Sequence, residues 1–303
     1  MIKNMDTKRV KTSIIILTKN NGATIGKVLQ QISAQDVKDH FEIIIVDSGS
    51  SDDTIDRISR YDVKLYTIPP FDFGHGKTRN IASGYATGDY FVYLSADAIP
   101  AGRHWLKNLV NKLADEEVGA TFGRQLPHED APVMERFFIM KNYPPTTDTY
   151  SISDFNMNAF FSNVNSAIKR SVWNRIKFKE SLIISEDYDW AKSAQEAGYK
   201  IKYVPDAAVY HSHNYGLKQV FKRYFDSGAS FSQMGLKPDV LKNGIHYFIE
   251  EMRYVGRENF FKIPYAICYD LFKLLGYLAG ARHKWIPIFI KKHLSMHAYY
   301  WKN

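Results

Sequence analysis

The sequence predicts an α/β protein with a mostly parallel, twisted sheet flanked by helices. Short apolar runs at residues 13–17, 42–46 and 90–94 are typical of strands that are buried on both faces. Segments with apolar residues at helical spacing follow them, and turns rich in Ser, Asp and Gly separate the two kinds of segment. This alternation of strand and helix favours right-handed crossovers and parallel pairing.

The individual elements follow from the same local patterns. We expect strands at residues 13–17, 42–46, 63–67, 90–94, 117–124, 165–169, 200–204 and 208–210. We expect helices at residues 24–32, 54–60, 77–86, 105–113 and 190–197, the last closed by Gly198. Residues 127–158 lack a clear period and contain Pro144 and Pro145, which predicts a long loop on the acceptor side of a site.

Composition excludes several classes of protein. A chain of 303 residues with 45% hydrophobic residues can build one large core, or a core domain and a smaller appendage. Cys268 is its only cysteine, so no intrachain disulfide forms and a cytosolic location is favoured. The first residues are polar and the apolar run at 14–17 is too short for a signal peptide, so we expect no export signal.

The positive charge is concentrated in the last third of the chain. The net charge is +8, and from Tyr215 onward there are 14 Lys or Arg residues and 6 Asp or Glu residues, which accounts for all of it. Because this part is also apolar and aromatic, an anionic phospholipid surface fits it better than nucleic acid does. A solvated basic face without a partner is the alternative.

Residues 263–278 are rich in large apolar side chains but include Asp270 and Lys273, so we do not expect them to span a bilayer. They are interleaved with basic residues and predict a pair of helices that lies against the body of the protein and, on one side, against the membrane interface. A helical cap packed entirely on the core is the alternative. We therefore divide the chain into residues 1–225, an α/β domain that we expect to hold the functional site, and residues 226–303, a helical extension close to the membrane.

Acidic residues recur just after the apolar runs, at Asp47, at Asp97 and at the Glu186-Asp187 step. In a parallel sheet the ligand crevice lies beyond the carboxyl ends of the strands, so these side chains can converge on one ligand. Asp47 stands at a strand end, where its carboxylate can accept from a nucleobase N–H or a ribose hydroxyl. Ser51 and Asp52, further along the turn, can equally be caps of the next helix.

The stretch FDFGHGKTRN at residues 71–80 places glycines before a helix and two cations, Lys77 and Arg79, near its first turn. Helix amides and an arginine fork suit a diphosphate. A glycine-rich turn with surface charges is the alternative reading, and it applies more to Lys77 than to Arg79.

Asp97 predicts a site for a divalent metal, Mg²⁺ or Mn²⁺, because such ions take few protein carboxylates and much substrate oxygen. A helix cap before Pro100 is the alternative. His211 and His213 end a strand and project to the same side, so either can be a further metal or diphosphate contact, and we favour His211.

Glu186 and Asp187 open a helix, where acids also favour the helix dipole, a reading that suits Asp189 best. An inverting sugar transfer needs a base that takes the proton of the acceptor hydroxyl, and a positioned carboxylate serves. Either Glu186 or Asp187 can be that base.

Taken together, these motifs resemble the inverting glycosyltransferases of family 2, which have a GT-A-type nucleotide-binding fold. The resemblance runs from about residue 12 to 225 and rests on the motifs TSIIILTKNN, EIIIVDSGSSDDT, GHGKTRN, YLSADAIP, SEDYDWAKSAQEAGYKI and AVYHSHNYGLKQ. In detail the chain looks most like bacterial rhamnosyltransferases of O-antigen and cell-wall polysaccharide assembly. PPFDFGHGKTRN, VYHSHNYGLKQVFKRYFDSG and LSMHAYYW carry that closer likeness.

The resemblance implies a role for each matching residue. Thr18 and Asp47 would contact the nucleotide base or ribose, and Arg79 would lie near the diphosphate. In the motif that begins SEDYDW, Asp187 would be the base and Glu186 its orienting neighbour. For the metal, the resemblance assigns Asp97 and His211, but Ser95 occupies the position at which the family commonly has a first acid.

We therefore expect transfer of L-rhamnose from a dTDP donor to a saccharide acceptor carried on a polyprenyl diphosphate, at the cytoplasmic face of the cell membrane. Nucleic acid is not an expected partner. Two alternatives stay open: the same fold using a galactose or N-acetylhexosamine donor, and an inactive nucleotide-sugar-binding scaffold in a polysaccharide assembly complex. The missing acid at Ser95 motivates the second.

Overall fold

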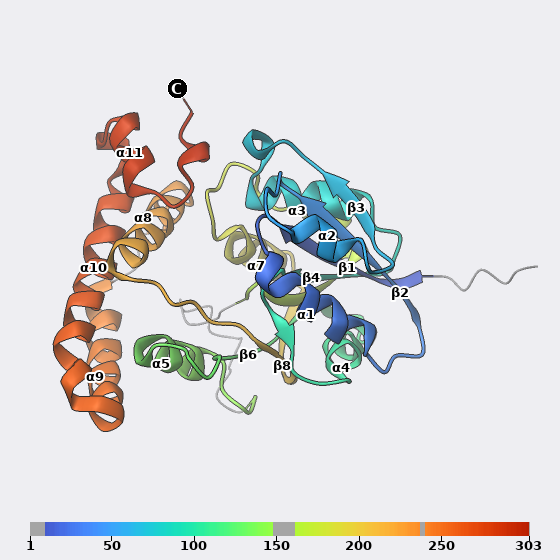
Figure 1. The fold of residues 1–303 in the computed structure, drawn as a ribbon, viewed down its shortest axis with the longest axis horizontal. Helices are drawn as coiled ribbons and strands as arrows, with labels where there is room; N and C mark the ends of the chain where they lie inside the picture. The colour runs from blue at the N-terminus through green and yellow to red at the C-terminus, as the bar shows by residue number, and fades with distance from the viewer. Residues whose placement is uncertain (1–9, 148–160, 237–239, 303) are drawn as a thin grey trace, which may run out of the picture.

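A computed structural model describes residues 10–147, 161–236 and 240–302. An eight-stranded sheet lies at the centre of the larger part of the molecule, with the strand order β3-β2-β1-β4-β7-β6-β8-β5 (Figure 1). The strands are β1 (Val10–Thr18), β2 (His40–Asp47), β3 (Lys64–Thr67), β4 (Tyr90–Ser95), β5 (Ile99–Pro100), β6 (Val118–Leu126), β7 (Asn165–Lys169) and β8 (Lys200–Tyr210).

The predicted fold class is confirmed, with one addition. β1 pairs in parallel with β2 and β4, β2 pairs in parallel with β3, and β6 pairs in parallel with β8. β7 runs antiparallel to both of its neighbours, so the sheet is mixed. Residues 200–204 and 208–210, expected as two strands, form the single strand β8, with a register irregularity opposite Gly123 and Gln125.

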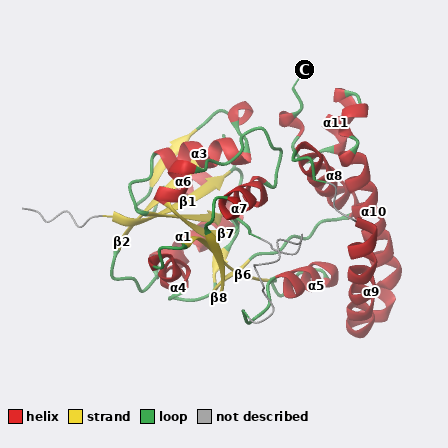
Figure 2. Cartoon of the chain, turned by 180° about the vertical axis from the view of Figure 1, so that it is seen from behind, coloured by secondary structure: helices red, strands yellow, loops and turns green. Residues whose placement is uncertain are grey.

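Helices cover both faces of the sheet (Figures 1 and 2). They are α1 (Gly22–Ser33), α2 (Thr54–Ile58), α3 (His75–Gly84), α4 (Trp105–Asn111), α6 (Arg170–Arg175) and α7 (Glu186–Glu196). Because side chains alternate along a strand, Ile14 and Ile16 of β1 pack with α1 and α4, whereas Ile15 packs on the other face with α3, α6 and α7. Two apolar cores, one on each face, therefore hold the strand ends rigidly.

The prediction of a long loop at residues 127–158 is wrong over part of its length. Val133–Asn142 forms a helix, α5, while residues 148–158 lie outside the described part of the chain. Val133 and Met134 pack with the C-terminal helices, and Ile139 packs with the core of the sheet. A helix buried on two sides has no single apolar stripe, which is why its period is hard to read from the sequence.

The C-terminal part forms a layer of helices beside the sheet (Figures 1 and 2). It consists of α8 (Leu217–Gln233), α9 (Val240–Asn259), α10 (Ile263–Ala281) and α11 (Ile288–Leu294). The helix pair expected here is thus a larger group of helices. Since α8 is continuous from Leu217, the boundary drawn after residue 225 falls inside a helix, and the division into domains stays a prediction.

Glycines allow α8 and α10 to pack with their backbones in contact. A Cβ atom on Gly280 would lie 1.9 Å from the carbonyl oxygen of Phe225, and one on Gly276 would lie 2.4 Å from that of Phe221. On the facing helix, a Cβ atom on Gly228 would lie 2.2 Å from the carbonyl oxygen of Tyr277. Small residues at such spacing permit close helix packing, and here they fix the position of α8, which faces the candidate site.

Candidate active site

The carboxyl ends of β1, β2 and β4 lie side by side, as the positions of the polar residues predict. Thr18 is in register with Asp47, and Leu17 is in register with Ser95. The Asp47 carboxylate is almost completely buried and accepts hydrogen bonds from the backbone N–H groups of Gly49, at 2.8 Å, and Ser50, at 2.9 Å, and from the Ser50 hydroxyl. Asp47 therefore organises the loop after β2, and Gly49 provides the positive φ of 79° that this turn requires.

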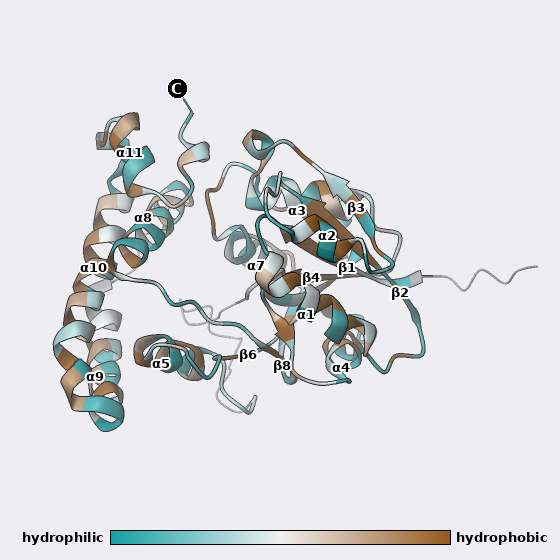
Figure 3. Ribbon diagram, viewed as in Figure 1, coloured by the Kyte–Doolittle hydropathy of each residue, from teal (hydrophilic) through white to brown (hydrophobic). Residues whose placement is uncertain are grey.

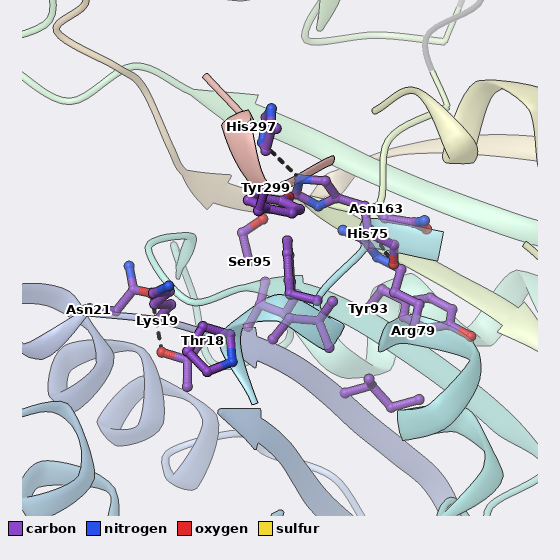
Figure 4. Close-up of a pocket in the computed structure, with 15 residues that line it drawn as sticks. Thr18, Lys19, Asn21, His75, Arg79, Tyr93, Ser95, Asn163, His297 and Tyr299 are labelled. Atoms are coloured by element: carbon purple, nitrogen blue, oxygen red, sulfur yellow. Dashed lines mark hydrogen bonds between the residues drawn. The ribbon is translucent and has the colours of Figure 1, made fainter. Parts of the chain in front are cut away.

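A pocket of about 260 Å³ opens at this edge (Figure 4). Three predicted residues line it: Thr18, Arg79 and Ser95. Its other walls are formed by Ile15, Leu17, Lys19, Asn21, Pro70, Phe73, His75, Tyr93, Leu94, Asn163, His297 and Tyr299. Because ligand pockets usually measure about 300 Å³ or more, this one is suited to part of a nucleotide and not to a whole nucleotide sugar.

Lys77 is not brought into the pocket. Its ammonium group pairs with the carboxylate of Asp72 at 3.0 Å, and both side chains are about two-fifths exposed. Arg79, two residues later on α3, lines the pocket (Figure 4) and donates to Glu186 of α7. The helix thus separates the two predicted cations, and only Arg79 lies at the site.

Asp97, His211 and His213 form a cluster that can hold a metal ion. One ligand atom from each of the three lies within 4.8 Å of the others, and His211 Nε2 is 3.7 Å from the Asp97 carboxylate. Both histidines named in the sequence thus belong to the cluster. Burial is the main cause that lowers the pKa of His213 to about 4 and that lowers the pKa of His211, so both rings are neutral, as metal ligands must be.

The orientation of His211 supports this assignment. Its Nδ1 lies 2.9 Å from the side-chain oxygen of Gln125, which accepts only, so Nδ1 carries the proton. Nε2 is then left with its lone pair toward Asp97. Gln125 is itself fixed, because its amide donates to the hydroxyl of Tyr143 at 2.7 Å. Such an outer contact is typical of histidines that bind metals.

The Glu186-Asp187 step lies at the start of α7, after Ser185 in the left-handed region at φ 64°. The Asp187 carboxylate accepts from the backbone N–H groups of Asn163, at 3.1 Å, and Tyr188, at 2.9 Å. A serine held at positive φ is a strained residue of the kind found at functional sites. Asp187 is only partly buried, so it is accessible to an acceptor.

Glu186 is buried, and its carboxylate accepts a hydrogen bond from the guanidinium of Arg79. Burial raises the pKa of Glu186, the charge of Arg79 opposes that rise, and the charge of Asp187 adds to it. Glu186 is therefore engaged with Arg79, whereas Asp187 faces outward. The structure separates the two acids that the sequence leaves as equivalent candidates for the base.

Several residues of the site carry no signal in the sequence that we recognised. Asn163 lines the pocket, is 1% exposed, and has a buried side-chain NH₂ with no hydrogen-bond partner among the described residues. Arg223 of α8 is half-buried and forms no ion pair within the described part of the chain. Its charge lowers the pKa of His75, of His211 and of Glu186, although burial is the main influence on all three. Arg223 is therefore a positive charge that acts on both the pocket and the metal cluster, although it does not line the pocket.

Comparison with known proteins agrees with this geometry. The sequence profile of the family described as Glycosyl transferase family 2 matches residues 13–176. The O-antigen chain rhamnosyltransferase RfbN of Salmonella typhimurium strain LT2 is 32% identical in an alignment of 308 positions that covers 97% of each chain. The O-antigen chain rhamnosyltransferase WbaN of Salmonella anatum is 34% identical over 86% of each chain.

Solved structures support the fold alone. The mannosyltransferase PcManGT from Pyrobaculum calidifontis, in complex with GDP-Man and Mn²⁺, matches with a TM-score of 0.61 and 20% identity, over 92% of this chain and 87% of that one. TarS 1-349 of S. aureus in complex with UDP matches with a TM-score of 0.55 and 16% identity, over 91% and 92% of the two chains.

Proposed function

This chain belongs to glycosyltransferase family 2, and from that premise we propose that it transfers L-rhamnose from dTDP-L-rhamnose to a saccharide acceptor, with inversion at the anomeric carbon. The two rhamnosyltransferases named above match nearly the whole chain, which supports this choice of sugar. One observation carries the mechanism. Asn163 lines the pocket with its side chain and donates to Asp187 with its backbone, so the nucleotide pocket and the candidate base lie side by side.

The proposed steps assign one task to each group. Thr18 and Ser95 bind the nucleoside, and Arg79 faces the diphosphate. Asp187 takes the proton from the acceptor hydroxyl, which attacks the anomeric carbon while the diphosphate leaves from the opposite face. Arg223 adds a second positive charge beside the leaving group. In a partly desolvated site such charges stabilise the developing negative charge strongly.

A divalent metal, Mg²⁺ or Mn²⁺, fits the donor set of Asp97, His211 and His213. One carboxylate and two neutral imidazoles are ligands that such an ion accepts, and these three residues would hold it at the site. When bound, such an ion acts as a Lewis acid that neutralises charge on the leaving diphosphate. Ser95 occupies the position of the first acid of the family's metal motif, and in this set His213 would provide a third ligand in place of that carboxylate.

We also propose that the acceptor is attached to a polyprenyl diphosphate and that the protein works at the cytoplasmic surface of the membrane. No helix within residues 10–302, as far as they are described, is both long enough and apolar enough to cross a bilayer. However, an apolar ridge runs along one face of α10, where Ile267, Leu271, Leu275 and Leu278 are each 37–49% exposed. Figure 3 shows that hydrophobic residues recur along this helix.

Large aromatic residues extend this ridge at both ends. Phe261, before α10, is 91% exposed, and Trp285 and Phe289, after it, are 89% and 66% exposed. The 19 residues of α10 make the helix that carries the ridge about 28 Å long. Lysines 262, 284, 291 and 292 lie beside the same residues in sequence. Apolar side chains flanked by basic ones fit the surface of an anionic bilayer.

Donor-dependent hydrolysis tests the proposed donor. Purified protein with Mn²⁺ is incubated separately with dTDP-L-rhamnose, with UDP-galactose and with a UDP-N-acetylhexosamine. A further sample contains no donor. Fastest release of nucleotide diphosphate from dTDP-L-rhamnose supports the proposal, and fastest release from a UDP-sugar supports the alternative donor. No release from any donor, together with no transfer, would support the inactive scaffold.

A further inference from the structure

Residues 295–301, which follow α11, reach the start of α3, and two of them line the pocket. His297 and Tyr299 of this segment line the pocket opposite Thr18 and beside His75 (Figure 4). The pocket is therefore built from parts of the chain that lie more than 200 residues apart. The Tyr299 hydroxyl is buried and has no hydrogen-bond partner among the described residues, so a ligand oxygen would satisfy it.

Asp226 of α8 holds the segment in place. Its carboxylate is fully buried and accepts from the backbone N–H of Met296, at 2.9 Å, and from Nδ1 of His297, at 2.8 Å. On the other side of the pocket residues, Trp301 packs against Phe225 in a small apolar cluster. Contacts on both sides of His297 thus restrict its ring to one position.

His297 in turn contacts His75, the first residue of α3. Nε2 of one ring lies 3.2 Å from Nε2 of the other (Figure 4). His297 also donates from Nδ1 to Asp226, so the two Nε2 atoms share one hydrogen bond in which one ring donates and the other accepts. Burial lowers the pKa of His75 well below its ordinary value, and the charges of His297, Arg79 and Arg223 lower it further, which is consistent with a neutral ring.

This contact is coupled to the diphosphate side of the pocket. Arg79 lies one turn after His75, and its guanidinium is 3.4 Å from the backbone carbonyl of His75. A displaced His75 ring would therefore disturb the start of α3 and the placement of Arg79.

We propose that Asp226 and His297 position His75, and that the 295–301 segment completes the binding site for the nucleoside diphosphate of the donor, with the Tyr299 hydroxyl as a direct contact. This inference rests on the proposed function, since it takes the pocket to be the nucleotide site. It makes His297 and Asp226 positioning residues, and it gives the last described segment of the chain a part in donor binding.

Calorimetric titration of the full chain with dTDP and Mn²⁺ tests it. His297→Ala and His75→Ala should each weaken dTDP binding by about three- to tenfold, the range that a lost hydrogen bond produces. The double variant should bind no more weakly than either single one, because the two rings act as a unit. His293→Ala, an exposed histidine on α11, is the matched control and should bind as wild type does. Tyr299→Phe should lose a similar factor.

Thermal unfolding without nucleotide checks that each variant is folded. Asp226→Asn keeps the size of the side chain and removes its charge. It therefore disturbs the contact with His297 without changing either histidine, and it should also weaken dTDP binding. Wild-type affinity in His297→Ala and Asp226→Asn, or additive losses in the double variant, would overturn the inference while the proposed function stands. A wild-type protein that binds no dTDP would contradict the proposed function as well.

Discussion

Arg79 donates a hydrogen bond to the carboxylate of Glu186, and the two side chains are only 12% and 4% exposed. This ion pair joins α3, which carries the cation of the pocket, to α7, which carries the candidate base. Asp187 follows Glu186 directly, so the pair fixes the start of the helix from which the base projects. The donor side and the acceptor side of the site are therefore mechanically connected.

Loss of Arg79 should destabilise the protein in a pH-dependent way. Arg79→Met leaves Glu186 buried without its partner, and breaking such a pair costs about 3–5 kcal/mol. Because burial already raises the pKa of Glu186, removal of Arg79 raises it further, so the lone carboxyl takes up a proton as the pH falls. The deficit in unfolding free energy relative to wild type should thus be larger at about pH 8 than at about pH 5. Urea unfolding at both pH values measures it, and an equal deficit at the two would contradict the assigned burial of the charge.

Asp187→Asn should abolish transfer and leave donor binding nearly intact. It removes the base without emptying the nucleotide pocket, and a general base contributes about 10²–10⁴-fold in rate. Asp189→Asn, on the same turn of α7, is the control and should retain most of the activity. Steady-state rates with an authentic acceptor, together with dTDP titration, separate the two effects. Wild-type turnover in Asp187→Asn would remove this residue from the role of base.

Variants of the metal cluster should show graded losses of metal-dependent dTDP binding. Asp97→Ala and His211→Ala should each weaken metal-dependent dTDP binding, because each removes a ligand. Gln125→Leu removes only the group that orients His211, and loss of such an outer contact typically costs about 10–100-fold in metal affinity. Titration of dTDP with and without Mn²⁺ measures all three. Identical affinities in both conditions for wild type and variants would exclude the cluster from donor binding.

The contact between α8 and α10 predicts a local effect of glycine substitution. Gly280→Ala places a Cβ atom 1.9 Å from a backbone carbonyl oxygen of α8, so the helices must separate. Overpacking of this kind costs about 1–3 kcal/mol. Gly26→Ala, in α1, is the control, because nothing lies within 4 Å of its added Cβ and the helix should gain about 0.5–1 kcal/mol. Chemical denaturation that gives the same sign for both substitutions would contradict the close packing.

Basic residues near the apolar ridge should contribute to membrane binding. Replacement of Lys284, Lys291 and Lys292 with Gln should lower binding to anionic vesicles by about two orders of magnitude, at roughly 1 kcal/mol for each charge. Activity on a water-soluble acceptor should be preserved. The difference should fade in high salt, because exposed charges are screened beyond about 10 Å at 0.1 M.

A matched triple variant of the α/β part, at the exposed residues Lys27, Lys38 and Lys107, controls for net charge in this vesicle experiment. Replacement of Phe261 and Trp285 with Ser should weaken binding at low and high salt alike, since those side chains act through apolar burial. Equal co-sedimentation of the ridge lysine variant and wild type at low salt would instead support a helical cap packed on the core.

Features that depend on local sequence patterns, such as the strands and the residues at their ends, can be predicted from the sequence. The strands that precede Asp47 and Asp97 are continuous apolar runs, so their ends, and the polar residues just beyond them, are placed correctly at one edge of the sheet. The sequence also names both histidines of the metal cluster, although β8 ends at Tyr210, so His211 and His213 lie just after the strand and not on it. Helix α5 was missed because it is buried on two sides.

Contacts between distant parts of the chain are not visible in local patterns. His297 lies at the pocket in a segment that contacts Asp226 of α8, and nothing in the residues around either of them indicates this pairing. Lys77 illustrates the opposite case: its place in the first turn of α3 suggests a ligand contact, but its side chain pairs with Asp72. The choice between Glu186 and Asp187 likewise depends on the guanidinium of Arg79, which lies 107 residues earlier in the chain.

Mass spectrometry of the reaction product shows directly whether this enzyme transfers rhamnose. Purified protein is mixed with Mn²⁺, a panel of synthetic polyprenyl-diphosphate-linked saccharides and equal amounts of dTDP-L-rhamnose, UDP-galactose and a UDP-N-acetylhexosamine, with Asp187→Asn run in parallel. We predict an acceptor that gains the mass of one or more deoxyhexose residues with the wild-type protein and no product with the variant. An acceptor that instead gains a hexose or an N-acetylhexosamine would contradict the claim.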